Sequence, residues 1–158
     1  MMDLFNPIIQ ESVDANMIFS DVFLSYAHKD NHYRKQVQKA LEKRGLSVWV
    51  DDRGIAPGES WQEAVQEAID NACVVVVILS PDAKESRYVN RELNYADNQK
   101  KRIFPILARG NSKNAVPFVV SGIQFVSIGK TSKAKFDAIM DNLAEAIRAH
   151  QGDGCTSS

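Results

Sequence analysis

Apolar residues follow two different spacings along this chain. Short apolar runs, typical of buried strands, alternate with longer segments in which apolar residues recur every three or four positions, as on one face of a helix. The expected strands are residues 21–26, 46–50, 73–79, 103–107 and 123–128. The expected helices are residues 30–44, 60–71, 131–150 and a segment that follows Pro81 and runs to about residue 101.

Strands that alternate with helices predict an α/β fold, a flavodoxin-like doubly wound five-stranded parallel sheet with helices on both faces. The run 73–79 is apolar throughout, which is typical of a central parallel strand. Gly45 is placed to end the first helix. Pro105 has no backbone N–H, so the strand 103–107 is expected to be short or to lie at an edge of the sheet.

The length of 158 residues predicts one domain, expected over residues 19–151, between an N-terminal extension, 1–18, and a disordered tail, 152–158. A formal net charge of −1 gives no case for binding nucleic acid or an anionic membrane. No apolar run approaches the roughly 18 residues of a membrane span. The first residues lack the basic region of a secretory signal.

The two cysteines are not expected to pair. Cys73 opens an apolar strand, whereas Cys155 lies in the polar tail, and no spacing of cysteines and histidines suits a metal. Unpaired cysteines favour a reducing compartment, so a cytoplasmic location is expected.

One carboxylate is well placed for chemistry. In a sheet of order 2-1-3-4-5, the loops after strands one, two and three meet at the switch point, where such folds bind ligands. Glu92 lies on the helix that follows strand three, beside the apolar positions Val89, Leu93 and Ala96. A carboxylate there could stabilise or attack an oxocarbenium-like centre. The plain alternative is a solvated helix glutamate.

Other residues near the same edge have two readings each. Asp51 and Asp52 could hold Mg²⁺ or could simply begin a turn. His28 could contact a phosphate or ribose, or be a solvated loop residue, and Trp61 could stack on a base or pack in the core. Neither GxGxxG nor GxxxxGK[ST] occurs, so a Rossmann dinucleotide grip and a P-loop are unsupported.

Three stretches carry a family resemblance: DVFLSYAHKD, LSVWVDDRGIAPGESW and AIDNACVVVVILSPDAKESRYVNREL. In this order and spacing they resemble a Toll/interleukin-1 receptor (TIR) domain of bacterial or plant type, over about residues 19–151. The resemblance implies hydrolysis of NAD⁺ to nicotinamide and ADP-ribose or a cyclic isomer, with NAD⁺ as substrate and no other cofactor. Glu92 matches the family's essential glutamate in the third helix.

Two departures from the family pattern concern the pocket. The aromatic residue four positions before the glutamate is usually Trp and is Tyr88 here, and His28 stands near a position where some active members carry Arg. The resemblance makes Glu92 the expected catalytic residue. The expected substrate-binding residues are Ser25, Tyr26, His28, Asp52, Trp61 and Tyr88.

The loop 52–59 matches a self-association element of the family, so activation by self-assembly in immune-type signalling, such as antiphage defence or virulence, is expected. Other TIR-containing proteins are possible partners. Two alternatives stay open: a non-catalytic TIR–TIR interaction module, and an enzyme similar to the nucleoside deoxyribosyltransferases. Loss of turnover on changing Glu92 would distinguish an NAD⁺-cleaving enzyme from the interaction module. The choice of substrate, a dinucleotide or a deoxynucleoside, would distinguish it from the deoxyribosyltransferase-like enzyme.

Overall fold

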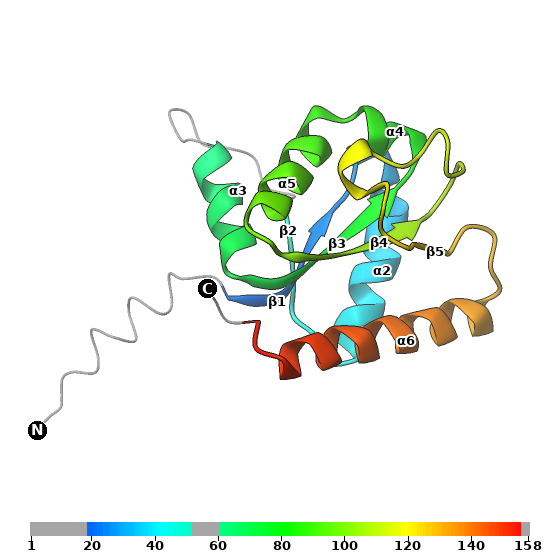
Figure 1. Ribbon diagram of the computed structural model, residues 1–158. Coiled ribbons are helices and arrows are strands. Elements are labelled where there is room, and N and C mark those ends of the chain that lie inside the picture. Colours follow the sequence, from blue (N-terminus) through cyan, green and yellow to red (C-terminus); the bar gives the residue numbers. More distant parts are fainter. Residues whose placement is uncertain (1–18, 52–60, 156–158) are drawn as a thin grey trace, which may run out of the picture.

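A computed structural model describes residues 19–51 and 61–155. Its centre is a parallel sheet of five strands in the order β2-β1-β3-β4-β5. The strands are β1 (Ser20–Ser25), β2 (Val48–Val50), β3 (Ala72–Leu79), β4 (Arg102–Leu107) and β5 (Val126–Ser127). This is the doubly wound topology that the sequence pattern predicts, and it places the switch point between β1 and β3 (Figure 1).

Helices cover both faces of this sheet (Figure 1). One face carries α2 (Asn31–Lys43) and α6 (Lys133–Gly152). The other face carries α3 (Trp61–Asp70) and α5 (Arg87–Asn98), with the short α4 (Pro81–Glu85) leading into α5. Two 3-10 turns, η1 (His28–Asp30) and η2 (Phe118–Val120), complete the described elements.

The core lies on both sides of β3, whose eight residues are all buried. Side chains of a strand point alternately to the two faces. Val74, Val76 and Ile78 accordingly pack in the cluster under α2 and α6, whereas Val75, Val77 and Leu79 pack in the cluster under α3 and α5. This double burial explains why the run reads as continuously apolar rather than alternating.

The segment expected as one helix after Pro81 is two helices with a break at Ser86. Ser80 accepts a hydrogen bond from the backbone N–H of Ala83 and caps α4. Ser86 has extended backbone angles and accepts from the N–H of Val89, so it ends α4 and caps α5. At the end of α2, Gly45 takes a φ of 89°, which confirms its predicted role.

Of the two expectations for the strand that contains Pro105, that it is short or lies at an edge, the edge position is wrong, and β4 has six residues. β4 lies between β3 and β5, but its pairing with β5 involves only Ile106 and Leu107, after the proline. The missing N–H of Pro105 therefore lies outside the described β4–β5 pairing. The fifth strand is correspondingly shorter than the six residues expected.

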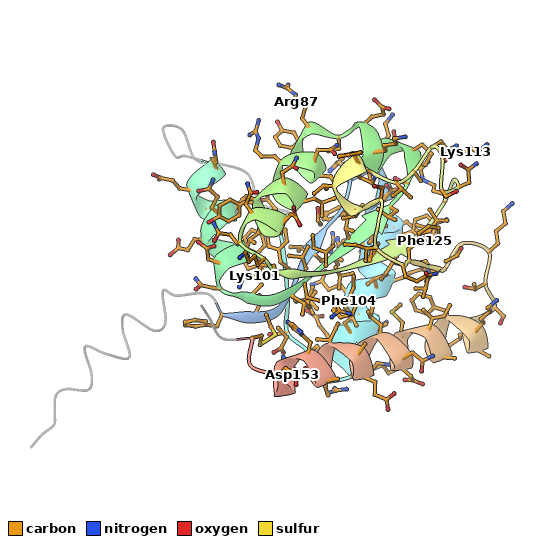
Figure 2. All side chains as sticks on the ribbon, viewed as in Figure 1. Arg87, Lys101, Phe104, Lys113, Phe125 and Asp153 are labelled. Carbon is orange, nitrogen blue, oxygen red and sulfur yellow. A yellow bond between two sulfur atoms is a disulfide. The ribbon has the colours of Figure 1, made fainter. Side chains whose placement is uncertain are left out.

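The expectation of unpaired cysteines is also wrong, and residues 152–155 of the tail expected to be disordered belong to the described structure, whereas residues 156–158 lie outside it. α6 continues to Gly152, and a turn then brings Cys155 to the amino end of β3, where it forms a disulfide with Cys73 at a Cα–Cα distance of 5.0 Å. Figure 2 labels Asp153 in this turn, beyond the end of α6. A sequence separation of 82 residues gave no hint of this proximity. The two cysteines therefore do not support the expected reducing compartment.

Among the helices that the structure describes, none combines the length and apolar character that crossing a membrane requires.

Candidate functional site

Three polar side chains gather where β1 and β2 end. Ser25 is the last residue of β1, Asp51 directly follows β2, and Glu92 lies in the middle of α5. Glu92 shares its helix face with Val89 and Leu93, which are completely buried against the sheet. Because that face packs inward, the carboxylate is carried into the interior, and the residue is 6% exposed.

Among the described residues, the hydroxyl of Ser25 donates a hydrogen bond to Oε1 of the Glu92 carboxylate at 2.6 Å. Burial raises the pKa of Glu92 to about 8, against the lowering effect of the Ser25 hydrogen bond, and the negative charge of Asp51 raises it further. The site therefore holds a carboxyl group that ionises near neutral pH. A cationic ligand beside it would favour the ionised form.

A narrow cavity between α3 and α5 has Glu92 in its wall. Its other lining residues are Gln62, Val65, Gln66, Ile69, Arg91 and Tyr95. The carboxylate thus lies between the end of β1 and the facing sides of two helices. Strongly shifted carboxyl groups in such recesses are typical of catalytic sites.

Of the candidates, the structure brings Ser25 into direct contact with Glu92. Tyr26 packs on the opposite face of the sheet with the α2 and α6 cluster, and the guanidinium of Arg34 lies 5.5 Å from its ring centre. His28 is exposed in η1, and Tyr88, one turn before Glu92, is 59% exposed. Asp52 and the loop 52–59 lie outside the described residues, as does the side chain of Trp61 at the start of α3.

A second polar cluster at the same edge was not predicted. The side chain of Asp30 is completely buried, accepts from the hydroxyl of Ser80, and accepts from Nε of Arg109 at 2.7 Å. Arg109 also pairs with Asp82 and lowers the pKa of that carboxyl group. The cluster joins segments that follow β1, β3 and β4, so it holds the carboxyl edge of the sheet together. Its signal in the sequence was a polar residue after each of these strands.

The Mg²⁺ reading of the acidic pair at residues 51 and 52 stays untested, because Asp52 lies outside the described residues. Within the ranges 19–51 and 61–155, no group of three or more His, Cys, Asp or Glu side chains is arranged to hold a metal ion.

Comparison with known proteins gives a family match across most of the chain. The model of the family described as "TIR domain" matches residues 22–144. A solved TIR domain of the Toll-related receptor TRR-2 from Hydra magnipapillata superposes with a TM-score of 0.67 at 24% identity, covering 82% of this chain and 98% of that one. At that identity the superposition supports the fold alone.

Two curated relatives are named for enzymatic activities. A probable 2′ cyclic ADP-D-ribose synthase, TcpO of Methanobrevibacter olleyae, is 31% identical over 133 residues, which is 80% of this chain and 38% of that protein. The NAD(+) hydrolase TirS of Staphylococcus aureus is 32% identical over 101 residues, which is 58% of this chain and 36% of that protein. The matched part of this chain thus spans well under half the length of either relative.

Proposed function

Because this chain belongs to the TIR domain family, we propose that it cleaves the bond between nicotinamide and ribose in NAD⁺, with Glu92 as the catalytic residue. The observation that carries the proposal is the buried Glu92 carboxylate, held by Ser25 at the carboxyl edge of the sheet. The two relatives named as an NAD(+) hydrolase and a probable 2′ cyclic ADP-D-ribose synthase support the same substrate.

The proposed reaction needs little acid–base chemistry. The nicotinamide of NAD⁺ is already a cationic leaving group, so its departure requires no proton. Departure leaves positive charge on the ribose, and an ionised Glu92 beside the anomeric carbon would stabilise that charge in a site sheltered from water. Binding the cationic nicotinamide favours the ionised form of Glu92, whose pKa is otherwise about 8.

Ser25 has a positioning role in this proposal. Its hydroxyl donates to Oε1 of Glu92 and so orients the carboxylate, whose other oxygen would face the ribose in this proposal. Attack by water on the ribosyl cation gives ADP-ribose, whereas attack by a nucleophile within the same substrate gives a cyclic product. We propose that assembly of several copies, involving the loop 52–59, controls this activity in immune-type signalling.

A Glu92→Gln variant tests the function. Purified wild type and variant are incubated with NAD⁺ over a range of protein concentrations, and nicotinamide and the second product are measured by chromatography and mass spectrometry. We expect the variant to lose at least about 100-fold in rate, because glutamine cannot supply the negative charge. Glu85→Gln, an exposed change on α4, is the matched control and should retain activity.

Two other outcomes would redirect the assignment. Absence of nicotinamide release by wild type at every concentration, with self-association intact, would favour a binding module without chemistry. Cleavage of a deoxynucleoside in place of NAD⁺ would favour the deoxyribosyltransferase-like enzyme.

A further inference from the structure

A broad groove lies on the face of the sheet opposite to Glu92. It runs between α2 and the segment that leads from β5 into α6. The helices α2 and α6 pack against each other, and the volume of the groove is about 700 Å³. Its lining residues are His32, Tyr33, Gln36, Lys39, Ala40, Lys43, Arg44, Ile128, Lys130, Thr131, Lys133, Phe136 and Asp137. A concave site of this size is in the range that small organic ligands occupy.

The groove is strongly basic in a chain whose net charge is −1. Five lysine and arginine side chains line it against one carboxylate, Asp137. Arg44 and Lys133 are neutralised in part, since both approach Asp137 and Arg44 also pairs with Asp141. Among the described residues, Lys39, Lys43 and Lys130 have no ion-pair partner.

One of these lysines, Lys130, lies in a tightly packed turn at the rim of the groove. A β-carbon at Gly129 would lie 2.4 Å from the carbonyl oxygen of Ala108, so only glycine permits the close approach that holds this turn against β4. The next residue, Lys130, has a φ of 57°, a conformation uncommon for residues other than glycine, asparagine and aspartate.

Aromatic rings and a helix end complete the site. Tyr33 and Phe136 are half-buried, pack against the core cluster, and line the groove, so each offers an apolar surface. The groove also reaches the first turn of α6, where Ser132 caps the helix. Backbone N–H groups at a helix start favour phosphate. Cations beside flat apolar surfaces suit a ligand that carries both phosphates and a base.

We propose that the groove between α2 and α6 binds a small nucleotide with a diphosphate, at a site separate from that of Glu92. The diphosphate lies among Lys39, Lys43 and Lys130, and the base lies against Tyr33 or Phe136. This proposal does not depend on the proposed reaction.

Isothermal titration calorimetry with ADP tests the proposal, with adenosine and inorganic pyrophosphate as separate probes. Wild type is compared with Lys39→Glu/Lys43→Glu and with Lys35→Glu/Lys113→Glu, which makes the same charge change at exposed lysines outside the groove. We expect ADP to bind wild type and the control variant within about twofold of each other, and the groove variant to bind at least about tenfold more weakly. Pyrophosphate alone and adenosine alone should each bind more weakly than ADP.

The design separates this groove from the site of Glu92. ADP binding that is unchanged in the groove variant would place the nucleotide elsewhere and overturn the proposal, as would no ADP binding by wild type. Equal weakening in both double variants would indicate a general charge effect and would also overturn it. Circular dichroism confirms folding, and Lys130→Glu, a single change on another element, provides a second variant that should weaken binding in the same way.

Discussion

At the scale of single residues, the ionisation of Glu92 should control the pH dependence of activity. If the ionised carboxylate is the active form, kcat/KM for NAD⁺ should rise with pH, by up to about tenfold per unit, and level off above the pKa of about 8. Nicotinamide release measured between about pH 5.5 and 9.5 gives this profile. A flat profile would contradict a role for the Glu92 charge.

Ser25→Ala supplies a check on the same profile. The Ser25 hydroxyl favours the ionised form of Glu92, so removing that hydroxyl should move the midpoint of the kcat/KM profile to higher pH. A change at an exposed serine such as Ser121 should leave the midpoint in place.

The same ionisation should also appear in the stability of the protein. Between about pH 4.5 and 8, folded Glu92 keeps a proton that the unfolded chain has released, so the folded state binds more protons and wild-type stability falls as pH rises. The Glu92→Gln variant has no ionisable group at this position, so its stability should not fall with pH for this reason. The melting temperature of the variant relative to wild type should therefore be higher at pH 9 than at pH 5, as thermal melts followed by circular dichroism would show. An equal difference at both pH values would contradict the raised pKa.

At the scale of elements, the contact between Asp30 and Arg109 should stabilise the carboxyl edge of the sheet. Arg109→Gln would leave the buried Asp30 carboxylate with Ser80 but without its cation. The cost should be about 1–3 kcal/mol in the free energy of unfolding, less than for a fully buried pair because the Arg109 side chain is 38% exposed. Urea denaturation measures it.

Lys133→Gln is the comparison for Arg109→Gln. It breaks the pair between Lys133 and Asp137 on the surface of α6, which should contribute less than about 1 kcal/mol. Equal effects of the two changes would show that burial of Asp30 adds nothing.

The sequence predicted the elements better than their ends and contacts. The spacing of apolar residues identified the five strands, and the apolar run 73–79 identified the central one, because both depend on the local sequence pattern. The break at Ser86 depends on one capping hydrogen bond, and the shortness of β5 depends on which residues reach β4. Features of this kind cannot be predicted without knowing the contacts that the folded chain makes.

The candidate site divides in the same way. The resemblance singled out Glu92, but its burial and its bond to Ser25 depend on the packing of α5 on β1, 67 residues away in sequence. Tyr26 follows Ser25 directly yet packs on the other face. The Asp30–Arg109 contact spans 79 residues, which no short motif encodes.

At the scale of the whole molecule, the disulfide between Cys73 and Cys155 ties the end of α6 to the central strand. Replacing both cysteines with serine should lower the free energy of unfolding by about 2–4 kcal/mol, since the bond closes a loop of 82 residues. Urea denaturation of wild type with and without reductant should show the same decrease. Reductant should not affect the double variant, and unchanged wild-type stability on full reduction would contradict the prediction.

The disulfide also places Cys155 on the same side of the domain as Phe19. Phe19 and Cys155, at the two limits of the described chain, line the same recess at the amino edge of the sheet, whereas Ser25 and Glu92 lie toward the carboxyl edge. Chain that continues from Phe19 or Cys155 therefore leaves from the side remote from Ser25 and Glu92. Immobilisation on a support, or fusion to a fluorescent reporter, on that side should leave the Glu92 edge facing solution.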